Sequence, residues 1–334
     1  MRAAGPRLGL LVLRRRELAC RALAVHDGEV TFGDPAVWST QAWRAEATAW
    51  LDERLADAGA RRTGPIEQPR LRPWATLLRA PTTQGAVWLK AGGPDTGYEA
   101  ALYGLLAREA PGHVLAPIGI DAARGWVALP DGGPSLGERL QGEARAAAMC
   151  AALPHYAELQ RRLAPQAERL LELGVPDMRP AVMPHRFEQA LAATGPSDVH
   201  GRLEGMRDAV LDWCRRLDDG PVPPSLDHND LHDRNVVGDP RRPRFYDWGD
   251  SVVAHPFASM LVPLSMGGGD RLRDAYLEGW TDLAPRAELV ETLELACRVA
   301  TIARSLTWLR AVGDGSEPQW ADAPLRTLAS LLDG

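Results

Sequence analysis

The spacing of hydrophobic positions divides the chain into a mixed first part and a helical second part. Residues 8–33 read as short strand-like pieces separated by turn signals. From 36 to 59, apolar residues recur at helical spacing and Gly59 suits the C-cap, so we expect one helix here. Its apolar face is formed by Trp43, Ala47, Trp50, Leu51 and Leu55.

Next comes a block of five strand-like runs with one helix inserted after the third run. The helix is expected near Tyr98–Ala110, and a hairpin turn at 82–85 joins the second and third runs. Residues 130–134, Pro-Asp-Gly-Gly-Pro, are incompatible with regular structure and predict a linker. The five runs are Ile66–Arg70, Ala75–Ala80, Ala86–Lys90, Val114–Ile120 and Trp126–Leu129.

Helical periodicity dominates the chain after the linker, with a single β-like interruption. Asn235–Val237 is expected to pair with Arg244–Tyr246 across a turn. We therefore predict an N-terminal extension over 1–60 packed on a small lobe, a mostly β lobe over 61–130 and a helical lobe over 131–334. The predicted helices cover residues 136–151, 154–174, 182–194, 200–219, 256–265, 269–281, 286–312 and 322–332.

Composition narrows the class of protein without naming a function. The 334 residues are 45% hydrophobic and 25% charged, which is typical of a soluble globular protein. No apolar stretch approaches the roughly 20 residues that a membrane-spanning helix needs. The short apolar run 8–13 ends at three arginines, which argues against an export signal, and four widely spaced cysteines suggest reduced thiols. We expect a cytoplasmic protein that does not bind membranes.

The two parts of the chain differ in charge. Residues 1–130 carry a net charge of +3 and residues 131–334 carry −9, which together give −6. An acidic second part repels phosphates and argues against nucleic acid as a partner. It suits a cationic small molecule, although a solvated acidic surface explains it equally well. The pattern carries no information about oligomeric state.

Lys90 is the only lysine among the 38 basic residues of the sequence. Arginine has replaced lysine elsewhere, so a retained lysine suggests a task for a compact ammonium that the planar guanidinium does not perform. Lys90 ends the third strand-like run, and Glu99 follows at the start of the predicted helix. The alternatives are a plain charge at a strand end and an ordinary acidic residue at a helix N-terminus.

Two polar clusters carry the candidate chemistry. Asp227-His228-Asn229-Asp230-Leu231-His232-Asp233-Arg234-Asn235 precedes two valines, and Phe245-Tyr246-Asp247-Trp248-Gly249-Asp250 follows. Cores do not collect such residues without partners, because unpaired buried polar groups are costly. A loop carboxylate such as Asp230 orients a hydroxyl and accepts its proton, while the oxygens of Asn235 and Asp247 suit Mg²⁺.

His228-x-Asp230-x-x-x-x-Asn235, followed by Asp247-Trp248-Gly249-Asp250, resembles the catalytic and metal loops of the aminoglycoside phosphotransferase and choline kinase family. The resemblance covers roughly residues 62–320. It implies an α+β, protein-kinase-like fold with two lobes: a small five-stranded antiparallel β lobe with one helix, and a larger, mostly helical lobe. It further implies transfer of a phosphate from ATP, with Mg²⁺, to a hydroxyl of a small molecule.

The resemblance also implies roles for individual residues. Lys90 would hold the ATP phosphates and Glu99 would position Lys90. In the linker, Leu129 and Asp131 would present backbone groups to adenine, although a plain linker fits as well. His228 and Asp250 would support the two loops without touching the substrate.

The sequence departs from the protein-kinase pattern at two places. The loop 70–76 lacks the glycines that let backbone amides approach phosphates. Either Arg72 or Thr76 contacts phosphate through its side chain, or the loop only leans over it. After Asp247 there is no room for a peptide-docking activation segment, so the acceptor should be small. The glycine-free loop keeps a second hypothesis open, namely a non-catalytic nucleotide-binding regulator. The segment carrying Asp177, Arg179 and His185 is either an acceptor wall or a charged helix face.

Overall fold

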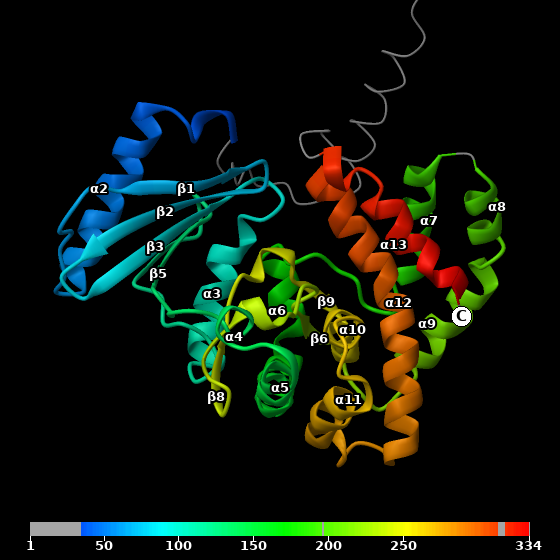
Figure 1. The fold of residues 1–334 in the computed structure, drawn as a ribbon. Coiled ribbons are helices and arrows are strands. Elements are labelled where there is room, and N and C mark those ends of the chain that lie inside the picture. The colour runs from blue at the N-terminus through cyan, green and yellow to red at the C-terminus, as the bar shows by residue number, and fades with distance from the viewer. Residues whose placement is uncertain (1–34, 196, 313–317, 334) are drawn as a thin grey trace, which may run out of the picture. The chain divides into compact units, whose positions relative to one another are not determined.

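The computed structural model describes residues 35–195, 197–312 and 318–333 (Figure 1). Five strands form an antiparallel sheet in the order β1-β2-β3-β5-β4. Lys90, near the end of β3, pairs with Leu77 of β2 and Val127 of β5, so it lies in the middle of the sheet. The strands are β1 Glu67–Arg72, β2 Ala75–Thr82, β3 Gly85–Gly92, β4 Gly119–Asp121 and β5 Trp126–Pro130.

Two helices belong to the sheet. Helix α2 (Gln41–Asp57) begins where the Thr40 hydroxyl accepts a hydrogen bond from the Trp43 amide, 3.3 Å away. Trp43 and Trp50 pack edge-on against Trp126 of β5, with ring centroids 5.9 and 5.7 Å apart. Helix α3 (Tyr98–Glu109) follows β3 as expected. The buried apolar face of α2 thus joins the sheet in one core, which agrees with the predicted helical periodicity.

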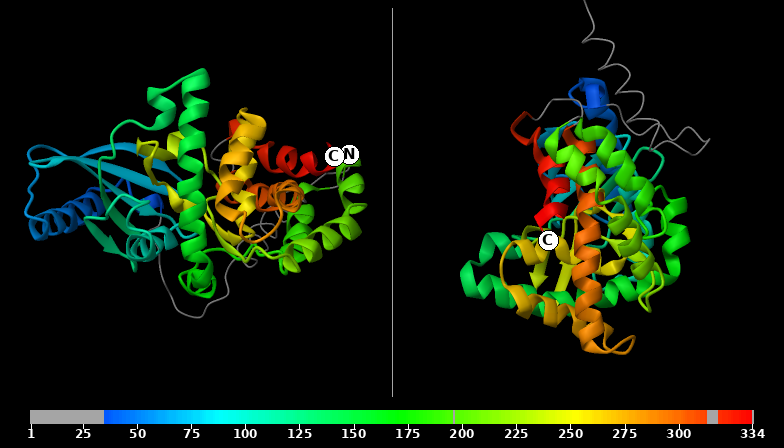
Figure 2. Two further views of the ribbon diagram at one scale, coloured as in Figure 1. Left: turned by 90° about the horizontal axis from the view of Figure 1, so that it is seen from below. Right: turned by 90° about the vertical axis from the view of Figure 1, so that its right-hand side faces the viewer.

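The helical part of the chain surrounds two short antiparallel ribbons. β6 (Ser225–Asp227) pairs with β9 (Val252–Ala254), and β7 (Val236–Asp239) pairs with β8 (Arg242–Phe245). The right-hand view of Figure 2 follows the long helix α12 in orange, with α13 in red beside it. The helices are α4 Leu136–Arg139, α5 Gly142–Leu163, α6 Ala167–Glu172, α7 Met183–Thr194, α8 Asp198–Glu204, α9 Arg207–Asp218, α10 Leu261–Ser265, α11 Gly269–Leu277, α12 Arg286–Val312 and α13 Ala323–Ala329.

The structure corrects the predicted break between the first two helices of this part. Helix α5 runs through Pro154 without interruption, and the break falls instead just before Gly142, whose φ is +52°. Proline costs one backbone hydrogen bond inside a helix, and here the burial of Leu153 and Tyr156 on either side compensates for that loss. Packing has therefore overridden a local helix breaker.

Other predicted boundaries also change. The run Val114–Ile120 is a strand only from Gly119 to Asp121, while Val114 forms an isolated parallel bridge with Phe245. Glycine 205 interrupts the helix predicted over 200–219, and the helix over 256–265 begins as a 3₁₀-helix, Pro256–Met260. The ribbon β6–β9 was not predicted, because two three-residue strands give too short a pattern.

The strand-like pieces over 8–33 lie outside the described residues. The domain boundaries at 60 and 130 stay predictions. In the described part of the chain, none of the helices is long and apolar enough to cross a membrane, and Cys150, Cys214 and Cys297 form no disulfide.

Candidate active site

Lys90 joins three segments that are distant in the sequence. Its Nζ lies 2.6 Å from Oε2 of Glu99 on α3, and it forms a second ion pair with Oδ1 of Asp247. The Lys90 and Glu99 side chains are 16% and 3% exposed. The lone lysine and two carboxylates of the sequence thus meet at one point between the sheet and the loop after β8.

A tight glycine-containing turn brings Lys90 and Glu99 together. A Cβ on Gly92 would lie 2.8 Å from Cα of Gly97, so the backbone at this position requires glycine. The Gly93 amide donates to the Trp74 carbonyl at 2.8 Å, which ties the turn to the loop between β1 and β2. The turn therefore places Glu99 in the first turn of α3, where it can reach Lys90.

The charges of Lys90, Glu99 and Asp247 shift one another's pKa values. Burial opposes the charge on Lys90, but Asp247 and Glu99 together outweigh burial and raise the pKa of the ammonium above its ordinary value. The Lys90 charge lowers the pKa of Asp247. Burial raises the pKa of Glu99, and Lys90 opposes that rise. Asp247 is therefore an ionised carboxylate held beside a cation.

The loop that carries Asp247 is fixed by contacts to α3. Asp247 has a left-handed backbone with φ of +64°, and the next residues form a 3₁₀-turn, Trp248–Asp250. The Trp248 amide donates to Oε1 of Glu99 at 2.9 Å, and the Tyr98 hydroxyl donates to the Gly249 carbonyl at 2.8 Å. A Cβ on Gly249 would lie 3.0 Å from Glu99 Oε2, so this glycine lets the loop approach the ion pair.

The loop that carries Asp230 begins with a strained residue. Asn229 has φ of +59°, a left-handed conformation that asparagine tolerates better than most residues. The backbone amide of Asn229 donates to Oδ1 of Asp227 at 2.7 Å. Its side-chain Nδ2 donates to the Asp250 carbonyl at 3.1 Å and to the Thr307 hydroxyl at 2.8 Å. These bonds compensate for the strain and connect this loop to the Asp247 loop.

Asp230 is held by two basic groups. Nη2 of Arg304 on α12 donates to Asp230 Oδ1 at 2.7 Å, and Nε2 of His232 lies 3.5 Å from Oδ2. Burial would raise the pKa of Asp230, but His232 and Arg304 outweigh it and lower the pKa to about 2. The carboxylate is therefore ionised at neutral pH and fixed in orientation.

Asn235 lies on the far side of the same loop. Its Nδ2 donates to the Asp230 carbonyl at 3.0 Å, which commits the nitrogen end of the amide to the loop. The remaining amide oxygen and the Asp247 carboxylate are hard oxygen donors of the kind that Mg²⁺ prefers. Asn235 is 5% exposed, so its position is set by packing. These two residues fit the metal role that the sequence predicts for them.

His228 does not reach a carboxylate. It is fully buried, and its Nε2 donates to the Tyr246 carbonyl at 3.0 Å. Its ring packs against Trp248 at a tilt of 42°, with centroids 4.6 Å apart. Burial lowers the pKa of His228, so the ring is neutral. This hydrogen bond holds the backbone of the residue before Asp247, which fits the supporting role that the sequence predicts for His228.

Comparison with known proteins places this geometry in a family. The sequence model of the phosphotransferase enzyme family matches residues 91–289, more than half of the chain. The chain belongs to this phosphotransferase family. No curated protein sequence matches the chain. The two-lobed, protein-kinase-like α+β fold and the family that the sequence motifs predict are thereby confirmed.

Solved structures share the fold of this phosphotransferase at low sequence identity. Macrolide 2′-phosphotransferase MphH from Brachybacterium faecium is 19% identical over 85% of this chain and 98% of its own, with a TM-score of 0.55. Choline kinase LicA from Streptococcus pneumoniae is 16% identical over 85% and 99%, with a TM-score of 0.56. A GDP and kanamycin complex of the phosphotransferase APH(2″)-IIIa is 14% identical over 86% and 98%, with a TM-score of 0.57.

Two arginines of this phosphotransferase were missed by sequence reasoning. Arg304 and Arg310 both lie on α12, and Arg310 Nη2 donates to Asp250 Oδ1 at 2.8 Å and to the Gly249 carbonyl at 3.2 Å. Arg304 Nη1 lies 3.7 Å from Asp250 Oδ2 and also donates to the Asn229 carbonyl at 2.8 Å. Asp250 thus connects α12 with both loops. No local signal in the sequence marks either arginine, because the partners Asp230 and Asp250 lie far away in the chain.

Polar side chains of the linker and of the loop between β1 and β2 are already engaged in hydrogen bonds within the protein. Both carboxylate oxygens of Asp131 accept hydrogen bonds, from Trp88 Nε1 at 3.2 Å and from the Gly133 amide at 2.8 Å. Leu129 is paired with Trp88 in the sheet. Thr76 is fully buried and its hydroxyl donates to the Arg70 carbonyl at 2.8 Å, so the idea that Thr76 contacts phosphate is wrong.

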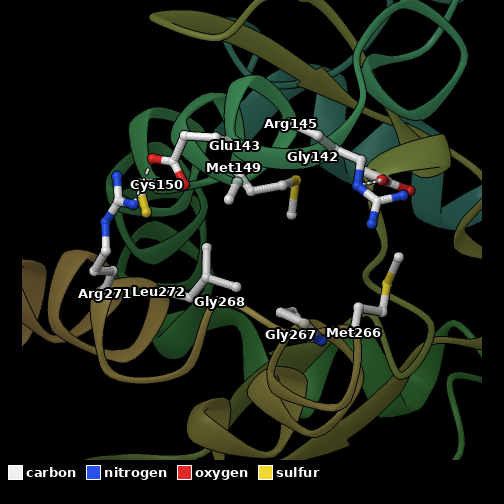
Figure 3. Close-up of a pocket in the computed structure, with 13 residues that line it drawn as sticks. Gly142, Glu143, Arg145, Met149, Cys150, Met266, Gly267, Gly268, Arg271 and Leu272 are labelled. Atoms are coloured by element: carbon white, nitrogen blue, oxygen red, sulfur yellow. Dashed lines mark hydrogen bonds and ion pairs between the residues drawn. The ribbon is translucent and has the colours of Figure 1, made fainter.

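A cavity of about 260 Å³ lies between α5, α11 and the loop that carries Asp230 (Figure 3). The Glu143–Arg271 ion pair borders one side and Arg145 the other, with Met149 between them. Arg145 pairs with Asp233 of that loop at 3.2 Å. Neither Lys90 nor Asp230 lines this cavity, so it is separate from the cluster described above.

The charged side chains of the segment predicted as an acceptor wall are paired, within the segment and with Glu168 of α6. Arg179 donates to both carboxylate oxygens of Asp177, at 3.0 and 2.8 Å, and Arg186 donates to the Asp177 carbonyl at 3.0 Å. His185, on the first turn of α7, contacts Gln189 at 3.1 Å. These contacts fit a braced helix start, and its use as an acceptor wall stays a prediction.

Proposed function

We propose that this phosphotransferase is an ATP- and Mg²⁺-dependent kinase that phosphorylates a hydroxyl of a small molecule in the cytoplasm. The observation that carries the proposal is the contact of Lys90 with both Glu99 and Asp247. This arrangement joins a phosphate-binding cation, the residue that positions it and a metal-binding carboxylate. Residues from the sheet, α3 and the loop after β8 must all be in place to form it.

Nucleotide binding would use Lys90 and the linker. Lys90 would contact the α- and β-phosphates, with Glu99 fixing the direction of its ammonium. Because the Asp131 carboxylate is already engaged with Trp88 and Gly133, adenine would be bound through backbone groups from Leu129 to Asp131. A structural neighbour was solved with GDP, so the donor test includes GTP as well as ATP.

Asn235 and Asp247 would hold Mg²⁺. Their donor chemistry fits, since an amide oxygen and an ionised carboxylate are both hard ligands. The chemistry that a metal held by these two residues would supply is positive charge to offset that of the phosphates. The protein's own part is to keep Asp247 ionised, which Lys90 does by lowering its pKa.

Asp230 would orient the acceptor hydroxyl and take its proton. With a pKa of about 2 the carboxylate is a weak base, so its main contribution is orientation of the hydroxyl toward the phosphate. This is sufficient for phosphoryl transfer through a loose transition state, in which the attacking hydroxyl keeps its proton until late. Arg304 and His232 hold the carboxylate still for that purpose.

Three observations bear on the class of acceptor: the short segment after Asp247, the described activities of structural neighbours, and the net charge of the second part of the chain. The absence of an activation segment after Asp247 favours a small acceptor over a peptide. Structural neighbours include proteins described as macrolide phosphotransferase and choline kinase. The net charge of −9 over 131–334 would favour a cationic acceptor, such as an aminoglycoside, amino sugar or amino alcohol.

The second candidate, a non-catalytic nucleotide-binding regulator, rests on the glycine-free loop 70–76. Against it stands the complete set of Lys90, Glu99, Asp230, Asn235 and Asp247. Loss of catalysis removes the constraint on such residues, and at least one of them would then be expected to change.

One experiment separates the two candidates. Nucleotide consumption with Mg²⁺ is measured with ATP and with GTP against aminoglycosides, amino sugars, simple sugars, amino alcohols and macrolides. Asp230→Asn serves as the inactive variant and Asp208→Asn, on the exposed surface of α9, as the matched control. Acceptor-dependent turnover that is lost only in Asp230→Asn supports the kinase. Nucleotide binding by calorimetry without turnover in any reaction supports the regulator.

A further inference from the structure

Three side chains of metal-binding type meet at a point outside the Lys90–Glu99–Asp247 cluster. His113 lies in the segment after α3, and His155 and Glu158 lie on α5. One ligand atom from each lies within 4.8 Å of the others. Within residues 35–195, 197–312 and 318–333, this is the one group of three or more such side chains.

Rigid elements hold all three residues. His155 and Glu158 are three positions apart on α5 and therefore share a helix face. The His113 amide donates to the Ala110 carbonyl at 2.9 Å, and the His113 carbonyl accepts from the Phe245 amide at 2.8 Å. The three side chains are thus brought together by the backbone and not by a loose surface encounter.

The local contacts resemble those of a metal ligand set. Oε2 of Glu158 lies 3.4 Å from Nε2 of His113. Ligands of a tetrahedral Zn²⁺ with bonds near 2.1 Å are about 3.4 Å apart. The other carboxylate oxygen, Glu158 Oε1, accepts from Arg162 Nη2 at 2.7 Å, so a second group orients the carboxylate. Glu158 is 46% exposed, which leaves the point open to an entering ion.

We propose that His113, His155 and Glu158 bind a divalent transition-metal ion of the Zn²⁺ type, with water completing the coordination. Two imidazoles and one carboxylate select such an ion over Mg²⁺, which prefers oxygen ligands alone. Because the ligands come from two separate elements, the ion would fasten the segment after α3 to α5. Helix α3 carries Glu99 in its first turn, and the ion would fix the opposite, C-terminal end of that helix.

The affinity should be moderate. Three protein ligands leave at least one position to water, unlike the closed four-ligand sites of structural zinc. Nδ1 of His113 is buried and has no hydrogen-bond partner among the described residues, so the usual outer support of a ligating histidine is missing. The alternative is a plain hydrogen bond between His113 and Glu158 with no ion.

The test uses the full-length protein after dialysis against a chelator. It is titrated with Co²⁺, followed by the visible absorption of the bound ion, and then with Zn²⁺ in the presence of excess Mg²⁺. We expect one equivalent of Co²⁺, displacement by Zn²⁺ but not by Mg²⁺, and a higher melting temperature with Zn²⁺. His113→Gln, His155→Gln and Glu158→Gln should each weaken binding at least tenfold.

The matched control is His200→Gln. His200 also faces a glutamate, with its Nε2 3.7 Å from Glu204 Oε1. No third ligand joins this pair among the described residues, so the substitution should leave Co²⁺ binding unchanged. His155 is only partly buried, so its variant should fold even if that of His113 does not. Absence of binding in the wild type, or binding that persists in His155→Gln, would overturn the proposal.

Discussion

Arg304 of α12 holds the carboxylate of Asp230, with Nη2 of the guanidinium 2.7 Å from Oδ1. The same guanidinium donates to the carbonyl of Asn229, so it fixes both the side chain and the backbone of the loop. Its plane also lies over the ring of Trp308, with Cζ 5.2 Å from the centroid. A helix near the end of the chain thereby sets the direction of the carboxylate that we propose as catalytic.

Replacing Arg304 should lower the rate of the chemical step more than it weakens nucleotide binding. In Arg304→Met the Asp230 carboxylate loses its fixed direction, and we expect kcat to fall about 10- to 100-fold. The KM for nucleotide should change less than threefold, because no contact links Arg304 with Lys90. Steady-state kinetics with the acceptor found in the panel would measure both constants.

Two further variants test whether Arg304 acts by positioning. Arg304→Lys keeps the charge but loses the planar fork, so we expect only partial recovery of kcat. Arg326→Met removes an exposed arginine that pairs with Asp322 on a neighbouring turn and should behave as wild type. If Arg304→Met loses nucleotide affinity and kcat equally, the arginine is holding the fold together and not orienting Asp230.

Lys90 stabilises the protein as well as the proposed nucleotide site. Lys90→Met would leave Glu99, which is 3% exposed, beside Asp247 with no cation between them. Breaking a buried ion pair from one side costs about 3 kcal/mol of unfolding free energy, and nucleotide affinity should fall as well. Urea unfolding and calorimetry with ATP would measure the two effects.

A double variant separates these two roles. Lys90→Met combined with Glu99→Gln removes one of the unpaired charges and should recover part of the stability without restoring nucleotide binding. Arg62→Met is the control, because its pair with Asp52 lies in a more exposed setting and should contribute less than about 1 kcal/mol. A double variant that binds ATP as tightly as the wild type would contradict the proposed role of Lys90.

The sequence predicts those residues of the site whose chemical type and position along the chain are distinctive. Lys90, Glu99, Asp230 and Asp247 could be selected because each has a chemical task and a place relative to a strand, helix or loop. Arg304 could not, because its partner Asp230 lies 74 positions earlier and nothing local connects them. One arginine among many gives no sign of which carboxylate it will meet.

The errors in the fold have similar physical causes. Pro154 breaks an isolated helix, but in α5 the burial of its neighbours decides the outcome. β6 and β9 have three residues each and are held by pairing with one another, which periodicity within either segment does not reveal. The long amphipathic helices and the central strands were predictable because each repeats its pattern several times.

Because Asn229 has a left-handed backbone, we expect glycine to be more stable than alanine at this position. Asn229→Gly loses the side-chain bonds to Asp250 and Thr307 but fits φ of +59° without strain. Asn229→Ala loses the same bonds and adds left-handed strain, so it should be about 1 kcal/mol less stable than Asn229→Gly by urea unfolding.

At an ordinary helix position, alanine should be more stable than glycine. Glu291 is exposed on α12, and there glycine should be less stable than alanine by about 1 kcal/mol. If alanine is equal to or better than glycine at Asn229 as well, the left-handed conformation is not contributing to the energetics of the loop.

Burial of Asp227 predicts that its contribution to stability falls as the pH rises, which is the reverse of the usual behaviour of a carboxylate. Asp227 is fully buried, and Oδ2 has no hydrogen-bond partner among the described residues. Burial raises its pKa to about 6, although the Ser259 hydroxyl and the Asn229 amide oppose the rise. Between about pH 4 and pH 6 the folded state therefore binds more protons here than the unfolded state. Its contribution to stability falls as the pH rises through this range.

Asp227→Asn removes this titration, so the comparison with the wild type isolates it. Relative to the wild type, the variant should gain up to about 3 kcal/mol in unfolding free energy between pH 4 and pH 7. His255 titrates with the opposite sign, because burial lowers its pKa to about 3, but it is present in both proteins and cancels in the difference. Urea unfolding at pH 4, 5, 6 and 7 gives the values. A difference that stays constant with pH would mean that the carboxylate of Asp227 keeps its charge in the folded protein, and that contacts to Ser259 and Asn229 compensate for its burial.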